Sequence, residues 1–458
     1  MGAFILVNGF EDYWNRGIRE FEKIEDLYGQ SRMLRVGVLQ IRSGNVLERA
    51  IKFIEANKNN ESLENIILSI AGSIVYRFWD ENKLDEAKKF DLWIREFTKT
   101  HNVERKYILY YDLFGGTLLR EIRSQEDIDW CIFEASDFEK YVSDFSEETE
   151  ESFNLNRGTG PIFYDFYGDF VSTLKMDLLA GDKIFTKGLE LYGKYMGSLY
   201  ASVYISEYVC SVMLESGRWD EAQALIEKNE LLVSGEKNNS VVFQARTMVL
   251  IFEVAKSLYR GANENDADDL RQRLKTISKQ VTGYAKDLIP RVYLELNKPE
   301  KAEDYIEETM DYIRKTAITI DLIQAAVMLP STAVDIYSIQ GNRKKAEEYL
   351  SYLRDYSSKF DEKWIKCFMD KAEASYELYF GEIKNAIEKM KKVVSYFKSS
   401  GLLLKYAESS LELAKMYHKV GDWKNGSKNV TQALDIFTKL DCGSYVKKCL
   451  SLMELLKA

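Results

Sequence analysis

The feature that most constrains this chain is a short pattern that recurs seven times, a Gly or Asn followed five residues later by a small residue. Glycine and asparagine tolerate the positive φ that ends a helix, and a small side chain lets two helices approach closely. Each copy therefore predicts the turn of a helical hairpin. The last three intervals are 44, 40 and 40 residues, which indicates a regular repeat. The copies are Asn45/Ala50, Asn82/Ala87, Gly217/Ala222, Asn297/Ala302, Gly341/Ala346, Gly381/Ala386 and Gly421/Gly426.

The final copy shows the hairpin most clearly, in the segment from Tyr406 to Phe437. Apolar residues recur at helical spacing on both sides of Gly421-Asp422, where glycine can end one helix and aspartate can cap the next. A single hairpin of this length cannot bury both of its faces, so it has to stack on similar neighbours. The apolar stripes consist of Leu411, Ala414, Met416 and Tyr417 before the turn and of Trp423, Val430, Ala433, Leu434 and Phe437 after it.

This segment resembles a tetratricopeptide repeat (TPR). Leu413-Ala414, Tyr417, Gly421 and Ala433 fall at the spacing of that signature, whereas Gly426 stands where the family usually has alanine. The period is longer than the about 34 residues of the strict unit. It is similar to the repeats in the sensor superhelix of maltose-type transcription activators and related signal-transducing ATPases. The resemblance implies an all-α fold, a right-handed superhelix (solenoid) of antiparallel helical hairpins.

The hairpin pattern covers most of the chain, with one strong break. Residues 1–142 are expected to form N-terminal hairpin repeats, in which Phe10 to Arg42 has a helical pattern. Residues 143–160 combine acidic residues with glycines that cannot continue a helix, and they predict a long loop. Residues 161–458 are expected to form the TPR-like superhelix. Its first hairpin is diverged and turns at Gly181-Asp182, and Tyr445 to Leu456 forms a capping helix.

Composition excludes several classes of protein. The 4 prolines are too few for the turns of a large β protein, so long helices are favoured. The 5 cysteines lie far apart without a CxxC pair, and the 2 histidines cannot complete a metal site, so no metal is expected. Sparse cysteine indicates a reducing, cytoplasmic location. The apolar run from Phe4 to Val7 is too short for a signal peptide or a membrane span.

Motifs of catalysis and cofactor binding are missing from the sequence. It contains no Gly-x-x-x-x-Gly-Lys-Ser/Thr loop, no nucleophile elbow and no His-Glu-x-x-His motif. The densest acidic cluster, Asp266 to Asp269, begins a predicted helix, where the helix dipole favours carboxylates without any catalytic role. We therefore expect no enzyme and no cofactor. An α/α-barrel enzyme, which is also helical and aromatic-rich, is the alternative that remains.

Charge is unevenly distributed along the chain. The net charge is −10, yet residues 381–458 contain 14 Lys and 8 acidic residues, a net of +6. The acidic total disfavours direct binding of nucleic acid, because neutralisation of phosphates dominates that affinity. The basic end either docks an acidic partner or is the solvated surface of a terminal cap.

The resemblance to TPR proteins also nominates binding residues, because the first helices of such hairpins line the concave groove. The mixture of tyrosine with charged residues suits a protein or peptide partner. If this groove is functional, Tyr204, Tyr284 and Arg291 should be exposed on it. Alignment on the turn residue selects Tyr204, Glu207, Tyr284, Asp287, Arg291, Asp335, Phe368, Lys371, Lys415 and His418.

Two functional hypotheses of different class follow. The first is a non-catalytic scaffold that binds a protein or peptide in its groove. The second is an effector-sensing superhelix of a signal-transducing regulator, either as a fragment or with a separate partner chain, which would bind a small effector ligand. The composition, rich in Lys, Ile and Glu with few His, is typical of thermophilic, including archaeal, proteins.

Overall fold

Every regular element that the structure describes is a helix. The computed structural model describes residues 10–41, 44–81, 83–112, 116, 119–144, 164, 167–195, 204–233, 240–276 and 283–456. No β-strand occurs within these ranges. The predicted all-α class is confirmed.

The chain divides into two compact units, and each is described by itself. Unit 1 comprises Met1–Glu121, Asp127–Phe166 and Leu191–Gly197, and unit 2 comprises Ile122–Glu126, Tyr167–Glu190 and Ser198–Ala458. Of the predicted loop at 143–160, residues 145–160 lie outside the described residues.

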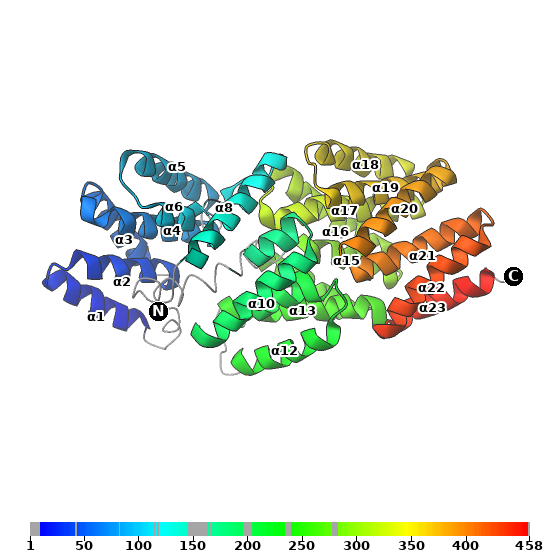
Figure 1. The fold of residues 1–458 in the computed structure, drawn as a ribbon, viewed down its shortest axis with the longest axis horizontal. Coiled ribbons are helices and arrows are strands. Elements are labelled where there is room, and N and C mark those ends of the chain that lie inside the picture. Colours follow the sequence, from blue (N-terminus) through cyan, green and yellow to red (C-terminus); the bar gives the residue numbers. More distant parts are fainter. Residues whose placement is uncertain are drawn as a thin grey trace. The chain divides into compact units, whose positions relative to one another are not determined.

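Unit 1 is built from short antiparallel helices, drawn in blue to cyan in Figure 1. Its core gathers aliphatic side chains of α4 around Trp14, whose indole N–H donates to the carbonyl oxygen of Met33 at 2.5 Å. The helices are α1 (Phe10–Lys23), α2 (Leu27–Gln40), α3 (Gly44–Asn57), α4 (Glu64–Asp80), α5 (Leu84–Thr100), α6 (Arg105–Tyr111) and most of α8 (Gln125–Asp144).

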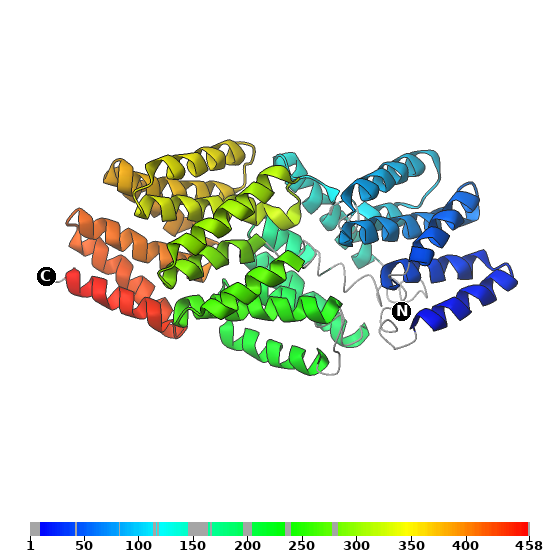
Figure 2. The same cartoon turned by 180° about the vertical axis from the view of Figure 1, so that it is seen from behind.

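Unit 2 is a stack of helical hairpins that follow one another side by side in both views (Figures 1 and 2). The first helix of a hairpin packs on its partner and on the first helix of the next hairpin, as α15 does with α16 and α17. The elements are most of α10 (Leu178–Tyr195), α12 (Trp219–Val233), α13 (Ser240–Arg260), α14 (Glu264–Thr276), α15 (Gly283–Glu295), α16 (Pro299–Lys315), α17 (Ile320–Ile339), α18 (Arg343–Ser357), α19 (Lys363–Phe380), α20 (Ile383–Ser399), α21 (Leu403–Lys419), α22 (Trp423–Lys439) and the capping helix α23 (Gly443–Leu455).

The small residues of the recurring pattern allow close approach of two helices, as the sequence predicts. The alanines at this position are completely buried between helices, and the turn residues Gly217, Gly341 and Gly421 have φ of 73°, 75° and 74°. The buried alanines are Ala50, Ala87, Ala222, Ala302, Ala346 and Ala386. Close helix approach is therefore common to these copies, whereas the left-handed turn is not: Gly381 has φ of −132°, and Asn45 lies inside α3 and not at a turn.

The glycine that replaces alanine in the last copy also has a structural reason. A Cβ on Gly426 would lie 2.8 Å from Cδ2 of Leu456, at the end of the capping helix. An alanine here would therefore require the side chain of Leu456 to move, whereas glycine lets the cap pack as it is.

Replacing Ala346 with leucine is expected to lower the free energy of unfolding by about 1–3 kcal/mol, because the added carbons overpack the buried hairpin interface. Glu347→Leu, at the neighbouring exposed position, is the matched control and should change it by about 0.5 kcal/mol or less. Urea denaturation measures both values. Equal midpoints for the two variants would contradict close approach at Ala346.

The helical stretch predicted from Phe10 to Arg42 is interrupted, and the structure places two helices there. Glu25 has φ of 54°, and the Asp26 carboxylate accepts a hydrogen bond from the Gly29 amide at 2.9 Å as the cap of α2. The apolar stripe continues through this break, which is why the periodicity conceals it.

The turn predicted at Gly181-Asp182 is also wrong, because both residues lie inside α10. The turn lies at residues 175–177, and Asp177 caps α10 by accepting from the Ala180 amide at 3.0 Å. A Cβ on Gly181 would lie 3.2 Å from that of Ser172. Gly181 therefore serves close helix packing and not a turn.

Early and late parts of unit 2 are in contact, and the repeat pattern does not predict this closure of the stack. The indole N–H of Trp364, on α19, donates to the carbonyl oxygen of Leu174 at 2.8 Å. Lys175 pairs with Glu362 at 2.6 Å, which again joins the segment Tyr167–Glu190 of unit 2 to the residues at the start of α19. The early helices therefore cover part of the surface that an open stack would expose.

One described helix, α17, is long and apolar enough to cross a membrane by length and composition. In the window Leu322–Ile339, 83% is buried by the neighbouring helices. This burial is what the core helix of a hairpin stack shows.

Candidate functional site

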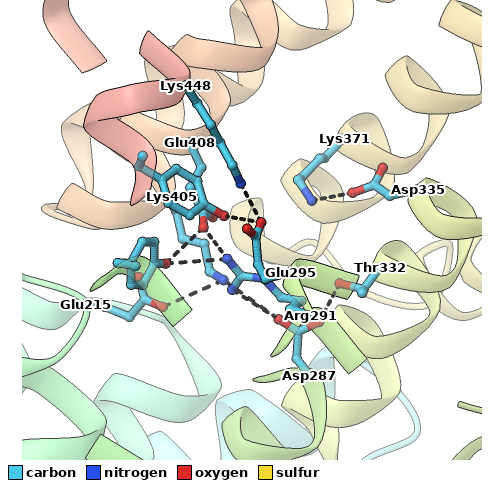
Figure 3. Close-up of polar contacts among 12 residues, drawn as sticks. Glu215, Asp287, Arg291, Glu295, Thr332, Asp335, Lys371, Lys405, Glu408 and Lys448 are labelled. Atoms are coloured by element: carbon cyan, nitrogen blue, oxygen red, sulfur yellow. Dashed lines mark hydrogen bonds and ion pairs between the residues drawn. The ribbon is translucent and has the colours of Figure 1, made fainter. Parts of the chain in front are cut away.

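A cluster of charged side chains lies where the first helices of four hairpins meet (Figure 3). On α15, Asp287, Arg291 and Glu295 follow at intervals of four residues, so they share one face of the helix. The other members come from the segment before α12, from α17, α19 and α21, and from the cap α23. The charged cluster consists of Glu215, Asp287, Arg291, Glu295, Asp335, Lys371, Lys405, Glu408 and Lys448.

At its centre, the guanidinium of Arg291 donates to the carboxylate of Glu408. The hydroxyl of Tyr259 donates to the same carboxylate at 2.9 Å. Nη1 of Arg291 lies 3.8 Å from Oδ2 of Asp287. The ammonium of Lys405 lies 3.7 Å from both Asp287 and Glu215.

At its edges, the ion pairs are more exposed. Lys371 pairs with Asp335 at 2.7 Å, and Lys448 pairs with Glu295 at 2.5 Å. The side chains of Lys405 and Glu215 are each 4% exposed, whereas Lys448 is 38% exposed. Exposure therefore rises from the centre of the cluster towards α23.

Attraction between opposite charges favours the ionised forms of Glu408 and Lys371. Burial by itself raises the pKa of Glu408, but the positive charges of Arg291, Lys405 and Lys371 outweigh it and lower that pKa. Burial likewise lowers the pKa of Lys371, yet the charge and hydrogen bond of Asp335 raise it above its usual range. Glu408 and Lys371 are thus held in their charged forms at neutral pH.

A π-helical turn brings Glu215 into the cluster. The helical segment described from residue 204 onward widens over Val209–Met213, where the Leu214 amide donates to the carbonyl oxygen of Val209 at 3.0 Å. A π turn inserts one extra residue and so rotates the residues after it about the helix axis. The backbone of Glu215 also accepts from the Leu404 amide at 3.3 Å, which holds it against α21.

Four of the residues nominated from sequence lie together in this cluster. They are Asp287, Arg291, Asp335 and Lys371, from three successive first helices. The prediction that Arg291 is exposed is wrong, however: its side chain is 14% exposed and that of Asp287 is 2% exposed. Lys415 lies further along α21 and pairs with Glu412 at 2.7 Å. His418 contacts Trp423 with ring centroids 5.2 Å apart, and Glu207 is half-buried.

Two nominated aromatic residues belong to the core, so their predicted place in an open groove is wrong. Tyr204 has no exposed surface and donates to the carbonyl oxygen of Phe185 at 2.5 Å. Phe368 is 3% exposed and packs edge-on against Phe397 at 5.5 Å. Their first helices are covered by neighbouring helices. The side chain of Tyr284 lies outside the described residues.

Sequence reasoning missed the remaining five members of the cluster. Lys405 and Glu408 are three residues apart on α21, and with Glu412 and Lys415 they form a charged helical stripe that the sequence does contain. Glu295 also continues the spacing of Asp287 and Arg291. No local sequence pattern identifies Glu215, because its position depends on the π turn. The same holds for Lys448, which lies on the capping helix α23.

The carboxylates of the cluster are engaged with cations of the protein. Among the described residues, no group of three or more His, Cys, Asp and Glu could hold a metal ion. The five cysteines are free thiols. The arrangement can form charge-assisted hydrogen bonds, which suits recognition of a polar partner.

No family model and no curated protein matches this chain. Among solved structures, a Rap protein complexed with Competence and Sporulation Factor matches with a TM-score of 0.55 at 11% sequence identity, over 82% of this chain and 99% of that one. Aspartyl phosphate phosphatase F from Bacillus subtilis matches with a TM-score of 0.44 at 13% identity, over 82% and 94%. The first likeness supports a TPR-like helical-repeat fold. Neither structure shows the similarity to maltose-type activators.

Proposed function

We propose that this chain is a non-catalytic helical-repeat scaffold that binds a protein or peptide through the face of unit 2 that carries the charged cluster. The carrying observation is the convergence of Asp287, Arg291, Asp335 and Lys371 from three first helices. Sequence alignment on the turns selects these same positions as the ligand-facing ones.

Burial of so many charges supports a role in binding. A buried ion pair contributes little to stability compared with apolar side chains of similar volume, because both ions lose their hydration. The cluster places hydrogen-bond donors and acceptors from successive first helices within an otherwise apolar stack. Donors and acceptors in such a row match the alternating amide and carbonyl groups of an extended peptide and its charged side chains.

The structural neighbour adds support of a limited kind. The Rap protein, whose fold resembles this one over most of both chains, was crystallised with Competence and Sporulation Factor bound. A helical-repeat stack of this type is therefore able to hold a partner. The identity of the partner of this chain rests on the charged cluster, because 11% identity transfers the fold alone.

An affinity selection tests the proposal. Random linear peptides displayed on their encoding nucleic acid are selected on the full chain, and the enriched peptides are measured by fluorescence anisotropy. Lys371→Met combined with Lys415→Ala should weaken their binding by about ten-fold or more, since charge-assisted hydrogen bonds are lost. Lys359→Ala combined with Lys366→Ala removes the same charge where Lys359 and Lys366 pair with Asp355 and Asp361, and it should leave binding unchanged.

Two results would overturn the proposal. The first is that no peptide is enriched above a selection on the denatured chain. The second is that enriched peptides bind both double variants as tightly as the native chain, which would place them elsewhere. Melting temperatures of both variants establish that the comparison is made between folded proteins.

The effector-sensing hypothesis is favoured by one separate observation, the depth of Glu215 within unit 2. Its side chain is 4% exposed, deeper than a peptide backbone lying on the cluster would reach. A small effector or a single side chain of a peptide could reach it.

A further inference from the structure

We propose that Glu215 is the receptor for one cationic group, a primary ammonium or a guanidinium, on the ligand that binds the charged cluster. This inference rests on the proposed function, because it assigns the chemistry of the group that reaches the centre of the same site. The group could belong to a Lys or Arg side chain or to the amino terminus of a peptide, or to a free amine.

The first observation is that Glu215 is buried and that neither of its carboxylate oxygens accepts a hydrogen bond from a described residue. Burying an ionised carboxylate is costly unless it is paired and hydrogen-bonded. The ammonium of Lys405, 3.7 Å from Oε1, is beyond direct hydrogen-bonding distance and is shared with Asp287. Glu215 therefore retains its full capacity to accept hydrogen bonds.

The second observation is the charge balance of the cluster. Its described members are five carboxylates and four cations, which leaves one negative charge without compensation. The pairs at the edges, Lys371 with Asp335 and Lys448 with Glu295, are internally neutral. The excess charge thus falls at the centre, among Glu215, Asp287 and Glu408. One added positive charge would neutralise it.

The third observation is the spacing at the centre. Lys405 lies 3.7 Å from Glu215 and from Asp287, and Nη1 of Arg291 lies 3.8 Å from Asp287, although the other end of that guanidinium bonds directly to Glu408. Nη1 of Arg291 has no hydrogen-bond partner among the described residues. Polar groups separated by more than about 3.5 Å leave room for a bridging group between them, a water or a donor of the ligand. An ammonium donates three hydrogen bonds and could bridge the carboxylates of Glu215 and Asp287.

The exposure gradient gives the direction of approach. Arg291 and Glu408 are each 14% exposed, between the buried Glu215 and the more open Lys448. A long side chain could extend past them with its charged end at Glu215, as Lys and Arg side chains commonly do along partly apolar surfaces. The main chain of the ligand would then remain on the more exposed part of the cluster.

The first arm of the test uses simple cations on the full chain. Nα-acetyl-L-argininamide and n-butylamine should raise the melting temperature at neutral pH and constant ionic strength, because binding to the folded state stabilises it. Nα-acetyl-L-citrullinamide and butanol, their uncharged counterparts, should not. The shift should disappear in Glu215→Gln and persist in Glu388→Gln, a carboxylate on the exposed surface of α20. Equal shifts in both variants, or none in the native chain, would overturn the free-amine form of the site.

The second arm uses the selected peptides. Their basic residue is replaced by citrulline or norleucine, and the dissociation constants are compared in the native chain and in Glu215→Gln. Each change alone should weaken binding by about ten-fold or more, and both together should weaken it no further than one. Independent losses that multiply would overturn the inference. Should Glu215→Gln fail to fold, the peptide substitutions in the native chain still decide, since unchanged affinity would contradict a cationic group at this place.

These outcomes separate the two proposals. Peptides that bind the cluster regardless of their basic residue would leave the scaffold function standing and remove the cationic subsite. Amines that shift the melting temperature, with no peptide enriched, would support the cationic subsite and overturn the scaffold function. A carbonyl stretch of a protonated carboxylic acid, lost in Glu215→Gln by infrared spectroscopy, would also overturn the inference, because a proton would then neutralise the excess charge.

Discussion

Replacing Arg291 with methionine is expected to lower the free energy of unfolding by about 3–5 kcal/mol, because it leaves buried carboxylates without their cation. The guanidinium of Arg291 is hydrogen-bonded to Glu408 and lies beside Asp287. Because these side chains are buried, water cannot easily take the place of the guanidinium beside the two carboxylates. Urea denaturation of the native and variant chains measures the difference.

Two control variants test whether the loss of stability comes from leaving buried charge unpaired. Arg291→Met combined with Glu408→Leu removes both ions, and it should recover most of the loss, since an apolar pair of similar volume tolerates burial. Arg343→Met removes an exposed arginine that contacts Tyr376 and should cost about 1 kcal/mol or less. A loss in Arg291→Met no larger than in Arg343→Met would show that the charged cluster is hydrated and contributes no buried network.

The same prediction has a pH dependence with a definite sign. The pKa of Glu408 is lowered in the folded state from an ordinary value of 4.5. Its ion pairs therefore stabilise the fold fully above that ordinary value, and this stabilisation is lost as pH falls through the lower folded-state pKa. The stability difference between the native chain and Arg291→Met should accordingly narrow below about pH 4.5. A constant difference down to the acid transition would contradict an ionised Glu408.

The hairpin fold could be predicted from sequence because its requirements are local. A residue with positive φ at the turn and a small residue one helical turn into the second helix are both needed within one hairpin. Ala346 and Gly341 show this directly, the first completely buried and the second at φ of 75°. Helix boundaries were less predictable where a polar cap interrupts a continuous apolar stripe, as Asp26 does.

The charged cluster could be predicted only in part, and the reason is again physical. Asp287 and Arg291 share one helical face, so a single alignment places both. Glu215 reaches the cluster because a π turn shifts its register and because unit 2 closes on itself. Neither event leaves a periodic trace in the sequence, since each depends on contacts between residues far apart in the chain.

Aromatic residues on the first helices misled the sequence interpretation for a related reason. An aromatic side chain at such a position serves equally well as a groove residue or as core packing, and only the neighbouring elements decide. Tyr204 is covered because its helix packs on α10 at Phe185. The charged positions were more informative, because burial of an ion demands a partner whereas burial of a ring does not.

Replacing Trp364 with alanine is expected to lower the free energy of unfolding by about 3–5 kcal/mol, the usual range for removal of a buried tryptophan. Trp364 has no exposed surface, packs edge-on near Phe368 and donates its indole N–H to Leu174. That hydrogen bond joins the first helical segment of unit 2 to α19, so the substitution loosens the closure of the stack as well as its core.

Trp364→Phe separates the two contributions, because it keeps much of the apolar volume and removes only the donor. Leaving the buried carbonyl oxygen of Leu174 without a partner should cost about 1–3 kcal/mol. Trp423→Ala is the matched control, since Trp423 is 48% exposed at the start of α22 and its loss should cost far less. Amide hydrogen exchange shows which part of unit 2 opens. Loss of closure should speed exchange in residues 167–174 before it affects α21 and α22. Uniform acceleration across unit 2 would show instead that Trp364 supports the whole stack and that closure is not a separate element of its stability.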